Sequence, residues 1–250
     1  MSARRPYRSD VSDARWALIE PVFAAWRARR TGPGTAARVH ELREIVNAIL
    51  HVNRTGIPWE YLPHDFPPYK TVYGYYAKWE ADGTTQQVHD LLRDKTRRSH
   101  GRSTQPTAAV IDAQSVKTSA NVAETSQGID AGKKIILLDD LAAHPSVAKV
   151  WANDGYQSSI FNHGAGLGID VEVVQRPRTK GFEPLPKRGG IERTFGWLMQ
   201  HRRLARDYEA LPQRSRAMIH WAMANKMSRE PTGESAPTWR IETDIPLASA

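Results

Sequence analysis

Three acidic residues stand where carboxylates from distant parts of the chain could act together. Asp112 ends the short apolar run 107–111, Asp154 comes just after the run 147–151, and Glu192 falls in the first turn of a predicted helix. If both runs are strands of an α/β sheet, their ends can meet in one crevice. Magnesium prefers oxygen ligands of this kind, and a pair of metal ions can activate an attacking oxygen and stabilise a leaving one. Three converging acids would therefore form a site for phosphodiester chemistry.

Each acid also has a purely structural interpretation. An Asp-Gly pair such as Asp154 and Gly155 often forms a turn. A glutamate in a first helical turn, such as Glu192, is favoured by the helix dipole whatever its function. The chain holds 27 acidic residues, so spacing alone does not distinguish a joint site from three unrelated acids.

The segments around these acids predict a layer of strands and helices. Apolar runs bounded by turn residues predict strands at 107–111, 147–151 and 169–174. Helices are predicted at 136–143, at 158–164, from 191 onward and at 215–227. Because strands and helices alternate, we expect an α/β domain over residues 104–228, with some parallel pairing.

The first part of the chain, residues 1–103, predicts a separate helical domain. Apolar residues recur every three or four positions after Ser12, between 39 and 50, after Thr71 and around Val88. Ser12 and Thr71 are the expected helix caps. Short helices with tight connectors suit a helix-turn-helix-like DNA-binding domain, and the alternative is a small helical domain without DNA contacts. The candidate surface contacts are Lys70, Tyr73 and Lys78.

Charge and composition favour a nucleic-acid partner. The 35 Lys and Arg residues exceed the 27 acidic ones, which gives a net charge of +8. Basic runs at 94–102, 176–187 and 201–203 lie near the candidate acids. Such an excess favours polyanions, because each neutralised phosphate releases counterions. The chain has no cysteine, which excludes disulfides, thiolate zinc sites and cysteine nucleophiles. No apolar run approaches the roughly 20 residues needed to span a bilayer.

Several segments, in order along the chain, resemble insertion-sequence DDE transposases of the IS4/IS5 type. The three acids lie in segments 112–118, 151–156 and 191–198, which resemble the three acidic motifs of that family. The segment 201–209 continues the last motif as the family does. Segments 16–21, 54–59 and 66–73 are similar to the N-terminal region of the same transposases.

The resemblance implies a ribonuclease-H-like catalytic domain in which Asp112, Asp154 and Glu192 are the catalytic acids and hold Mg²⁺ or Mn²⁺. Water, and then a freed 3′ hydroxyl, would attack phosphodiesters at the ends of a mobile element and in target DNA. The implied partner is double-stranded DNA, without membrane association, in a bacterial-type cytoplasm at the nucleoid. Whether the chain forms a homodimer stays open. The implied DNA-binding residues are Lys117, Arg188, Arg193, Arg202 and Arg203, beside Lys70 and Lys78 of the helical domain.

Two departures from the family affect this expectation. Gly189 and Gly190 stand where the family has a large aromatic and an apolar residue, which loosens the start of the helix bearing Glu192. The interval between Asp112 and Asp154 contains no pair of strand-like runs. We therefore expect an internal deletion with its joint near Lys134, which removes an antiparallel hairpin beside the Asp112 strand and leaves that strand with an unpaired edge.

The sequence thus leaves three functional interpretations open. The first is a DNA transposase of reduced or absent activity. The second is a non-catalytic DNA-binding remnant that binds element ends or pairs with intact copies. The third is a metal-dependent nuclease without strand transfer. Residues 229–250, which are rich in proline, are expected to form a flexible tail.

Overall fold

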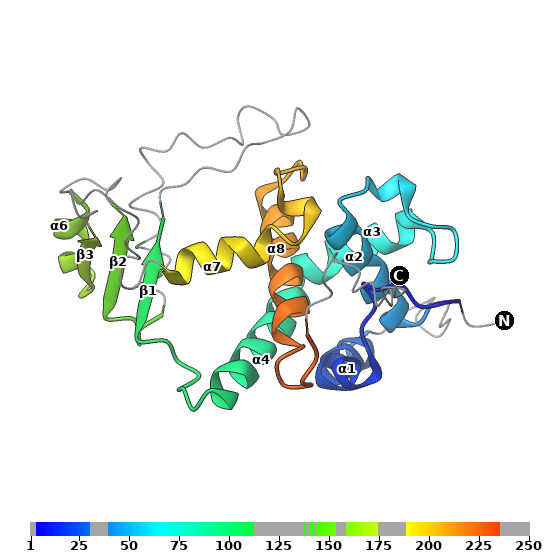
Figure 1. Cartoon of the computed structure of the whole chain (residues 1–250), viewed down its shortest axis with the longest axis horizontal. Coiled ribbons are helices and arrows are strands. Elements are labelled where there is room, and N and C mark those ends of the chain that lie inside the picture. Colours follow the sequence, from blue (N-terminus) through cyan, green and yellow to red (C-terminus); the bar gives the residue numbers. More distant parts are fainter. Residues whose placement is uncertain are drawn as a thin grey trace, which may run out of the picture.

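The computed structural model describes residues 4–30, 40–112, 138, 141–142, 144–153, 159–174 and 189–235. Figure 1 shows two parts: a bundle of helices, called here the helical body, and a small sheet joined to it by helix α7. Several predicted features lie outside the described residues. They are Asp154, Lys117, Arg188, the expected deletion joint near Lys134, and residues 236–250.

The helical body begins with the four helices that the apolar spacing predicts. They are α1 (Asp13–Ala28), α2 (Leu42–Thr55), α3 (Tyr69–Ala81) and α4 (Thr84–Ser99), with a short 3₁₀ turn η1 (Trp59–Tyr61) between α2 and α3. The cap predicted at Ser12 is confirmed, because its hydroxyl accepts a hydrogen bond from the backbone N–H of Arg15 at 3.2 Å. The cap predicted at Thr71 is wrong, since α3 starts two residues earlier, directly after Pro68. Pro68 is the N-cap residue, with extended backbone (ψ 134°), and its fixed φ and missing N–H end the preceding loop there.

The core of the helical body is built on large aromatic side chains. Phe23 of α1, Trp79 of α3 and Trp221 of α8 (Pro212–Met227) are each at most 1% exposed. Their rings lie 4.7 Å apart for Phe23 and Trp79, and 6.1 Å apart for Trp79 and Trp221, measured between centroids. Aromatic rings bury large apolar areas and gain further energy from such tilted contacts. Much of the stability of the helical body therefore comes from this aromatic cluster.

Helix α8 belongs to the helical body, although the chain order had grouped it with the α/β domain at 104–228. It packs against α4, α2 and α3, and its buried residues join the same core as those of α1 to α4. These buried residues are Ala217, Met218, Trp221, Ala224 and Met227. A helix that is apolar on several sides needs neighbours on several sides, and the small sheet does not supply them. The division of the chain at residue 103 therefore does not separate two independent packing units.

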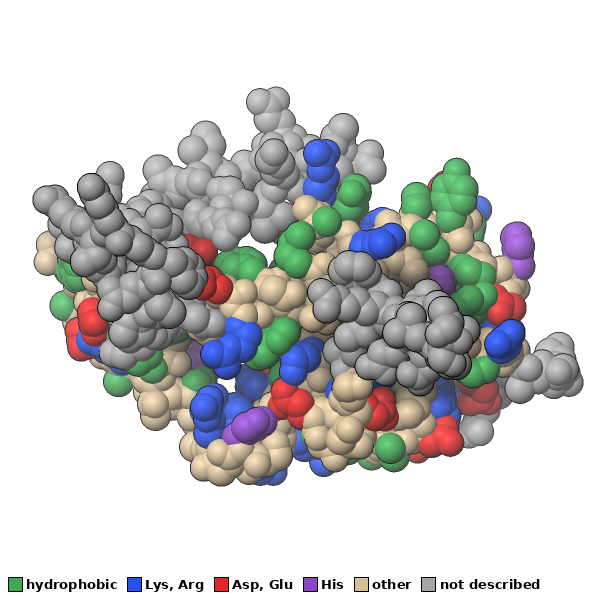
Figure 2. All heavy atoms as spheres, in the orientation of Figure 1, with side chains coloured by type: hydrophobic (Ala, Val, Ile, Leu, Met, Phe, Trp, Pro, Cys, Tyr) green, Lys and Arg blue, Asp and Glu red, His purple; other side chains and the backbone are tan. Residues whose placement is uncertain are grey.

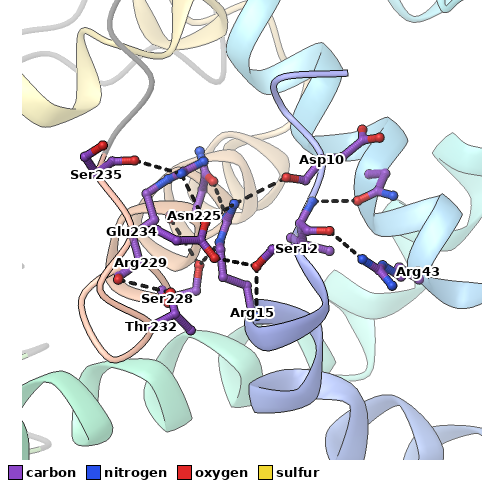
Figure 3. Close-up of polar contacts among 12 residues, drawn as sticks. Asp10, Ser12, Arg15, Arg43, Asn225, Ser228, Arg229, Thr232, Glu234 and Ser235 are labelled. Carbon is purple, nitrogen blue, oxygen red and sulfur yellow. Dashed lines mark hydrogen bonds and ion pairs between the residues drawn. The ribbon is translucent and has the colours of Figure 1, made fainter. Parts of the chain in front are cut away.

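The segment after α8 is held against the N-terminus by a buried polar network (Figure 3). The guanidinium of Arg15 is 1% exposed and donates to Ser228 Oγ at 2.9 Å and to the carbonyl of Asp10 at 3.3 Å. Ser12 donates to Glu234, which also forms an ion pair with Arg229 at 3.5 Å. Burial lowers the pKa of Arg15 to about 10, so it remains protonated at neutral pH. Residues 229–235 are therefore packed and hydrogen-bonded, which differs from the flexible tail predicted there.

The sheet contains three parallel strands, as the alternation of strands and helices predicts. They are β1 (Ala108–Ile111), β2 (Lys149–Asn153) and β3 (Asp170–Val174), in the order β1-β2-β3. Helix α6 (Ser159–Gly166) connects β2 to β3 and packs on β3. A second, smaller core lies here, built from residues such as Ile111, Val150 and Ile160. The coarse α/β expectation is therefore confirmed for this part of the chain.

Gly56 ends α2 at a position that an L-residue could occupy only with strain. Its φ is +76°, and a Cβ added there would lie 2.9 Å from Cβ of Arg202. Gly56→Ala is expected to lower the free energy of unfolding by about 1–3 kcal/mol, because it combines a left-handed backbone with this close contact. Urea denaturation followed by circular dichroism would measure the change.

The control for this substitution is Gly74→Ala, in the middle of α3. Apart from its chain neighbours and the backbone of its own helix, no atom lies within 4 Å of a Cβ added at Gly74, and alanine in a helix interior is favoured over glycine by about 0.5–1 kcal/mol. The two variants should therefore shift stability in opposite directions. Equal effects would contradict the account of the Gly56 turn.

Candidate carboxylate site

The carboxyl ends of β1 and β2 lie side by side. The two strands pair in parallel, with Ile111 opposite Ala152. Asp112 follows Ile111 directly and is partly exposed. Asp154 follows Asn153, the last residue of β2, but its own placement lies outside the described residues. The strands preceding Asp112 and Asp154 are therefore neighbours, which is the condition for a shared crevice.

Helix α7 (Gly189–Leu198), which carries the third acid, contacts β1. Glu192 lies exposed in its first turn. Figure 1 shows α7 running from β1 to α8, and residues of α7 contact both elements. At its far end the ammonium group of Lys226 from α8 lies over the Trp197 ring, 4.5 Å from the centroid. The helix that carries Glu192 is thus placed between the sheet and the helical body.

Strand β1 pairs with β2 and contacts α7, so the elements that precede or carry the three acids adjoin one another. The placement of the side chain is described for Asp112 and Glu192. Within the described residues, no three His, Asp or Glu side chains are grouped closely enough to hold a metal ion. Asp154 lies outside these residues. The chemistry of the donors, carboxylates next to a basic residue such as Arg193, suits a hard divalent cation and a phosphate.

The predicted DNA-binding residues have different surroundings. Lys70 and Lys78 are exposed on α3, where Tyr73 lies between them and is 38% exposed. Arg193, beside Glu192, and Arg202 are also exposed. These four cations are open to a phosphate backbone.

Arg203 differs from these four. It is 8% exposed, and its Nε and Nη2 atoms both lie 2.9 Å from Oε1 of Glu209. Its Nη1 donates to the carbonyl of Ile57 at 3.3 Å. A direct phosphate contact would require breaking this buried pair, which is costly because it leaves a buried charge uncompensated. Arg203 therefore links the 3₁₀ turn η3 (Arg202–Leu204) to the segment that follows α2.

Further basic side chains lie at the end of α4. Figure 2 shows Lys and Arg side chains grouped over the last turns of this helix. Arg98 and Arg102 are exposed there, while Arg97 donates from Nε to the carbonyl of Ser103 at 2.6 Å. The segment 94–102 that composition singles out as basic is thus largely a solvated surface.

The burial of His201 is not evident from the sequence. This residue is 4% exposed, and burial together with Arg54 and Arg229 lowers its pKa to about 3. The sequence marks His201 only as part of a basic run, and its burial depends on packing between segments far apart in the chain.

The low pKa of His201 predicts a loss of stability in acid. Between about pH 6.5 and pH 3 the unfolded chain binds a proton at this histidine that the folded chain does not bind. The free energy of unfolding should therefore fall by up to about 1.4 kcal/mol for each pH unit below 6.5. His201→Gln is expected to reduce the difference in urea midpoint between pH 7.5 and pH 5, compared with the unmodified chain. His64→Gln, at an exposed position, should leave that difference unchanged, and an equal effect of both substitutions would contradict this assignment.

A known family is similar to part of the helical body. Residues 11–89 match the family model described as "Putative transposase of IS4/5 family (DUF4096)". The match spans α1, α2, α3 and the first turns of α4, and confirms the predicted resemblance to IS4/IS5-type transposases over this region. No curated protein and no solved structure matches the chain. In the described residues, none of the helices is both long enough and apolar enough to cross a bilayer.

Proposed function

We propose that this chain, similar to IS4/5-type transposases over its helical body, is a DNA transposase that cleaves and joins phosphodiesters at the ends of a mobile element. The observation that carries the proposal is the meeting of β1, β2 and α7, the elements that lead to or carry Asp112, Asp154 and Glu192. These elements come from distant parts of the sequence, which supports a shared site for the three acids.

The topology supports a shortened ribonuclease-H-like sheet. In the sheet implied by the resemblance, the strand before the first acid pairs on one side with an antiparallel hairpin and on the other with the strand before the second acid. Among the described residues, β1 pairs only with β2, and β3 follows in parallel. This order matches what remains of such a sheet when the hairpin is removed.

The donor set fits a divalent metal ion. Asp112, Asp154 and Glu192 would hold Mg²⁺ or Mn²⁺, and the ion would supply positive charge to the oxygens of a scissile phosphate. Two observations support the fit: the paired ends of β1 and β2, and the contact of α7 with β1. The first makes the ends of the strands before Asp112 and Asp154 neighbours, and the second puts the helix of Glu192 in contact with the strand before Asp112.

The positive residues would hold the DNA. Arg193 lies beside Glu192, and Lys70 and Lys78 form a second exposed group on α3. Lys117 and Arg188 are proposed as further contacts from the resemblance alone. Phosphate contacts of this kind position a duplex without reading its sequence.

A second candidate function is a DNA-binding remnant without catalysis. The observation that favours it is the difference in core size between the helical body and the sheet. The helical body has a large aromatic core, whereas the described sheet has three short strands and a small core. A sheet with an exposed edge holds metal ligands less firmly, while DNA binding by the helical body would persist.

The test is cleavage of a plasmid that carries the flanking ends of the gene, in Mg²⁺ or Mn²⁺. Metal-dependent, end-specific cleavage and joining that Asp154→Asn abolishes would establish the transposase. Nicking without joining would indicate a nuclease. Binding to the ends without cleavage, unchanged by Asp154→Asn and by the metal, would indicate the remnant.

A further inference from the structure

Helix α7, which carries Glu192, has little packing of its own. Of the α7 residues whose burial the structure describes, none is buried. Residues of α7 contact β1 and α8, and the Trp197 ring lies under the ammonium group of Lys226, which also pairs with Glu230 at 2.6 Å. A cation–ring contact at the surface is weak. The position of Glu192 therefore depends on the segment to which the end of α7 is attached.

The end of α7 continues into η3 through hydrogen-bonded turns. The backbone N–H groups of Met199, Gln200 and His201 donate to carbonyls in the last turns of α7, at 2.8, 3.2 and 2.9 Å. The next turn is closed by the N–H of Leu204, which donates to the carbonyl of His201 at 2.9 Å. A 3₁₀ turn is a common connector at the C-terminal end of a helix. Because each turn is closed by a hydrogen bond, a displacement of η3 is transmitted to α7.

Arg203 attaches η3 to the segment that follows α2. Both members of the pair that it forms with Glu209 are buried, with 8% and 6% of the two side chains exposed. The Nη1 atom of Arg203 donates to the carbonyl of Ile57 at 3.3 Å. The backbone of Arg202 lies close to Gly56, where an added Cβ would come within 3.1 Å of the Arg202 carbonyl carbon. Arg203 thus connects the run that begins with α7 to the part of the chain that matches the transposase family.

Glu209 is itself held in place, and Arg203 and Glu209 together are called here the η3 anchor. The backbone N–H of Glu209 donates to Oδ1 of Asp207 at 3.1 Å, and the same oxygen accepts a hydrogen bond from the hydroxyl of Ser215 on α8 at 2.6 Å. The guanidinium of Arg203 also lies over the Tyr208 ring, 5.2 Å from its centroid. A buried polar network with its partners in place is rigid, so the η3 anchor holds one geometry.

We propose that Arg203, held by Glu209, is a positioning residue that keeps α7, and through it Glu192, in a fixed place relative to the helical body. This inference rests on the proposed function for its catalytic consequence. A helix rises about 1.5 Å per residue, so Glu192 lies roughly 9 Å along α7 from Leu198. A tilt of about 10° at that end would move Glu192 by roughly 1.5 Å, whereas catalytic groups are held within about 0.5 Å of their productive places. Arg203 thus acts through the position of α7 and touches neither DNA nor metal.

The first experiment measures how firmly α7 is held, with a spin label on each of two introduced cysteines. The chain has no cysteine, so Gly190→Cys on α7 and Ala81→Cys on α3 are labelled at those positions alone. Both positions are exposed. Apart from its chain neighbours and the backbone of its own helix, no atom lies within 4 Å of a Cβ added at Gly190. Electron–electron double resonance then gives the distribution of distances between the two labels.

Arg203→Lys is expected to widen this distribution. Lysine keeps the positive charge but loses the guanidinium fork that reaches Glu209 and Ile57 together. Gly190 lies roughly 12 Å along α7 from Leu198, so a tilt of about 10° widens the distribution by roughly 2 Å.

The matched control is Arg214→Lys, which makes the same change in another pair of this kind. Arg214 of α8 pairs with Glu80 of α3 and donates to the carbonyl of Ala77 at 2.8 Å, outside the run from α7 to η3. This control should leave the distance distribution unchanged. Circular dichroism verifies that each variant is folded.

The second experiment measures DNA cleavage by the unlabelled chains in Mn²⁺. Arg203→Lys is expected to lower kcat about 10- to 100-fold, because a displacement of about 1 Å far from the chemistry can cost that much. KM for DNA should stay within about twofold, since a positioning residue does not contact the substrate. Arg214→Lys should retain both values.

A distribution for Arg203→Lys as narrow as that of the unmodified chain, or an equal widening in Arg214→Lys, would overturn the positioning role and leave the proposed function intact. A wider distribution with an unchanged kcat would also overturn it, because Glu192 would then not depend on the η3 anchor. If the unmodified chain cleaves no DNA but Arg203→Lys alone widens the distribution, the η3 anchor stands and the transposase function fails.

Discussion

Replacing Trp221 with alanine is expected to lower the free energy of unfolding of the whole chain by about 3–5 kcal/mol. The indole is 1% exposed and packs beside the rings of both Phe23 and Trp79, at 6.5 Å and 6.1 Å between centroids. Its removal opens a cavity among three helices of the helical body, which cannot close without moving α8. Urea or thermal denaturation, monitored by helical circular dichroism, would measure the loss.

The control for this substitution lies on the same helix. Ile219 is 40% exposed, so Ile219→Ala should cost less than about 1 kcal/mol. A small effect of Trp221→Ala, comparable to that of Ile219→Ala, would contradict the assignment of α8 to the helical body. The same reasoning predicts that residues 1–103 alone do not fold cooperatively, because α8 supplies part of their core.

Glu192→Gln is expected to reduce metal-dependent DNA cleavage by at least about 100-fold, since loss of an outer-shell partner alone commonly costs 10- to 100-fold. The substitution keeps the shape and the hydrogen-bonding atoms of the side chain but removes the charge that would hold the metal ion. Glu192 is exposed in the first turn of α7, so the variant should retain the fold. DNA binding in the absence of metal should also be retained, because the charge removed is negative.

The control is Glu20→Gln on α1, an exposed acid in the helical body. It makes the same chemical change away from α7 and should leave the cleavage rate within about twofold. If Glu192→Gln cleaves as fast as the unmodified chain, Glu192 does not belong to the catalytic site.

The elements of this fold were largely predictable because each carries its own local signal. Apolar residues at spacings of three and four predicted α1 to α4, and short apolar runs predicted all three strands. The start of α3 was missed because Pro68 outweighs the capping tendency of Thr71. The place of α8 was missed for a different reason: its sequence shows that it is buried, and only the packing shows by which neighbours.

In the candidate site too, some features could be predicted from the sequence and others could not. The approach of Asp112 to the end of β2 followed from strand positions and the rules for parallel sheets. The burial of Arg203 against Glu209 and that of His201 beside Arg54 and Arg229 could not be predicted, because each depends on contacts between distant segments. The basic run 201–203 therefore contains both an exposed cation, Arg202, and a buried cation, Arg203, that is paired with Glu209.

The most direct test of the central claim is Mn²⁺ binding to the full chain, followed by electron paramagnetic resonance of the free ion. It examines whether the carboxylates converge, and it does so whether or not the shortened sheet supports turnover. We predict that the unmodified chain binds Mn²⁺ and that Asp112→Asn and Asp154→Asn each weaken this binding by at least about tenfold, whereas Glu20→Gln does not. Equal Mn²⁺ affinity for all four proteins, or no binding by any of them, would contradict the claim that Asp112, Asp154 and Glu192 form a metal site.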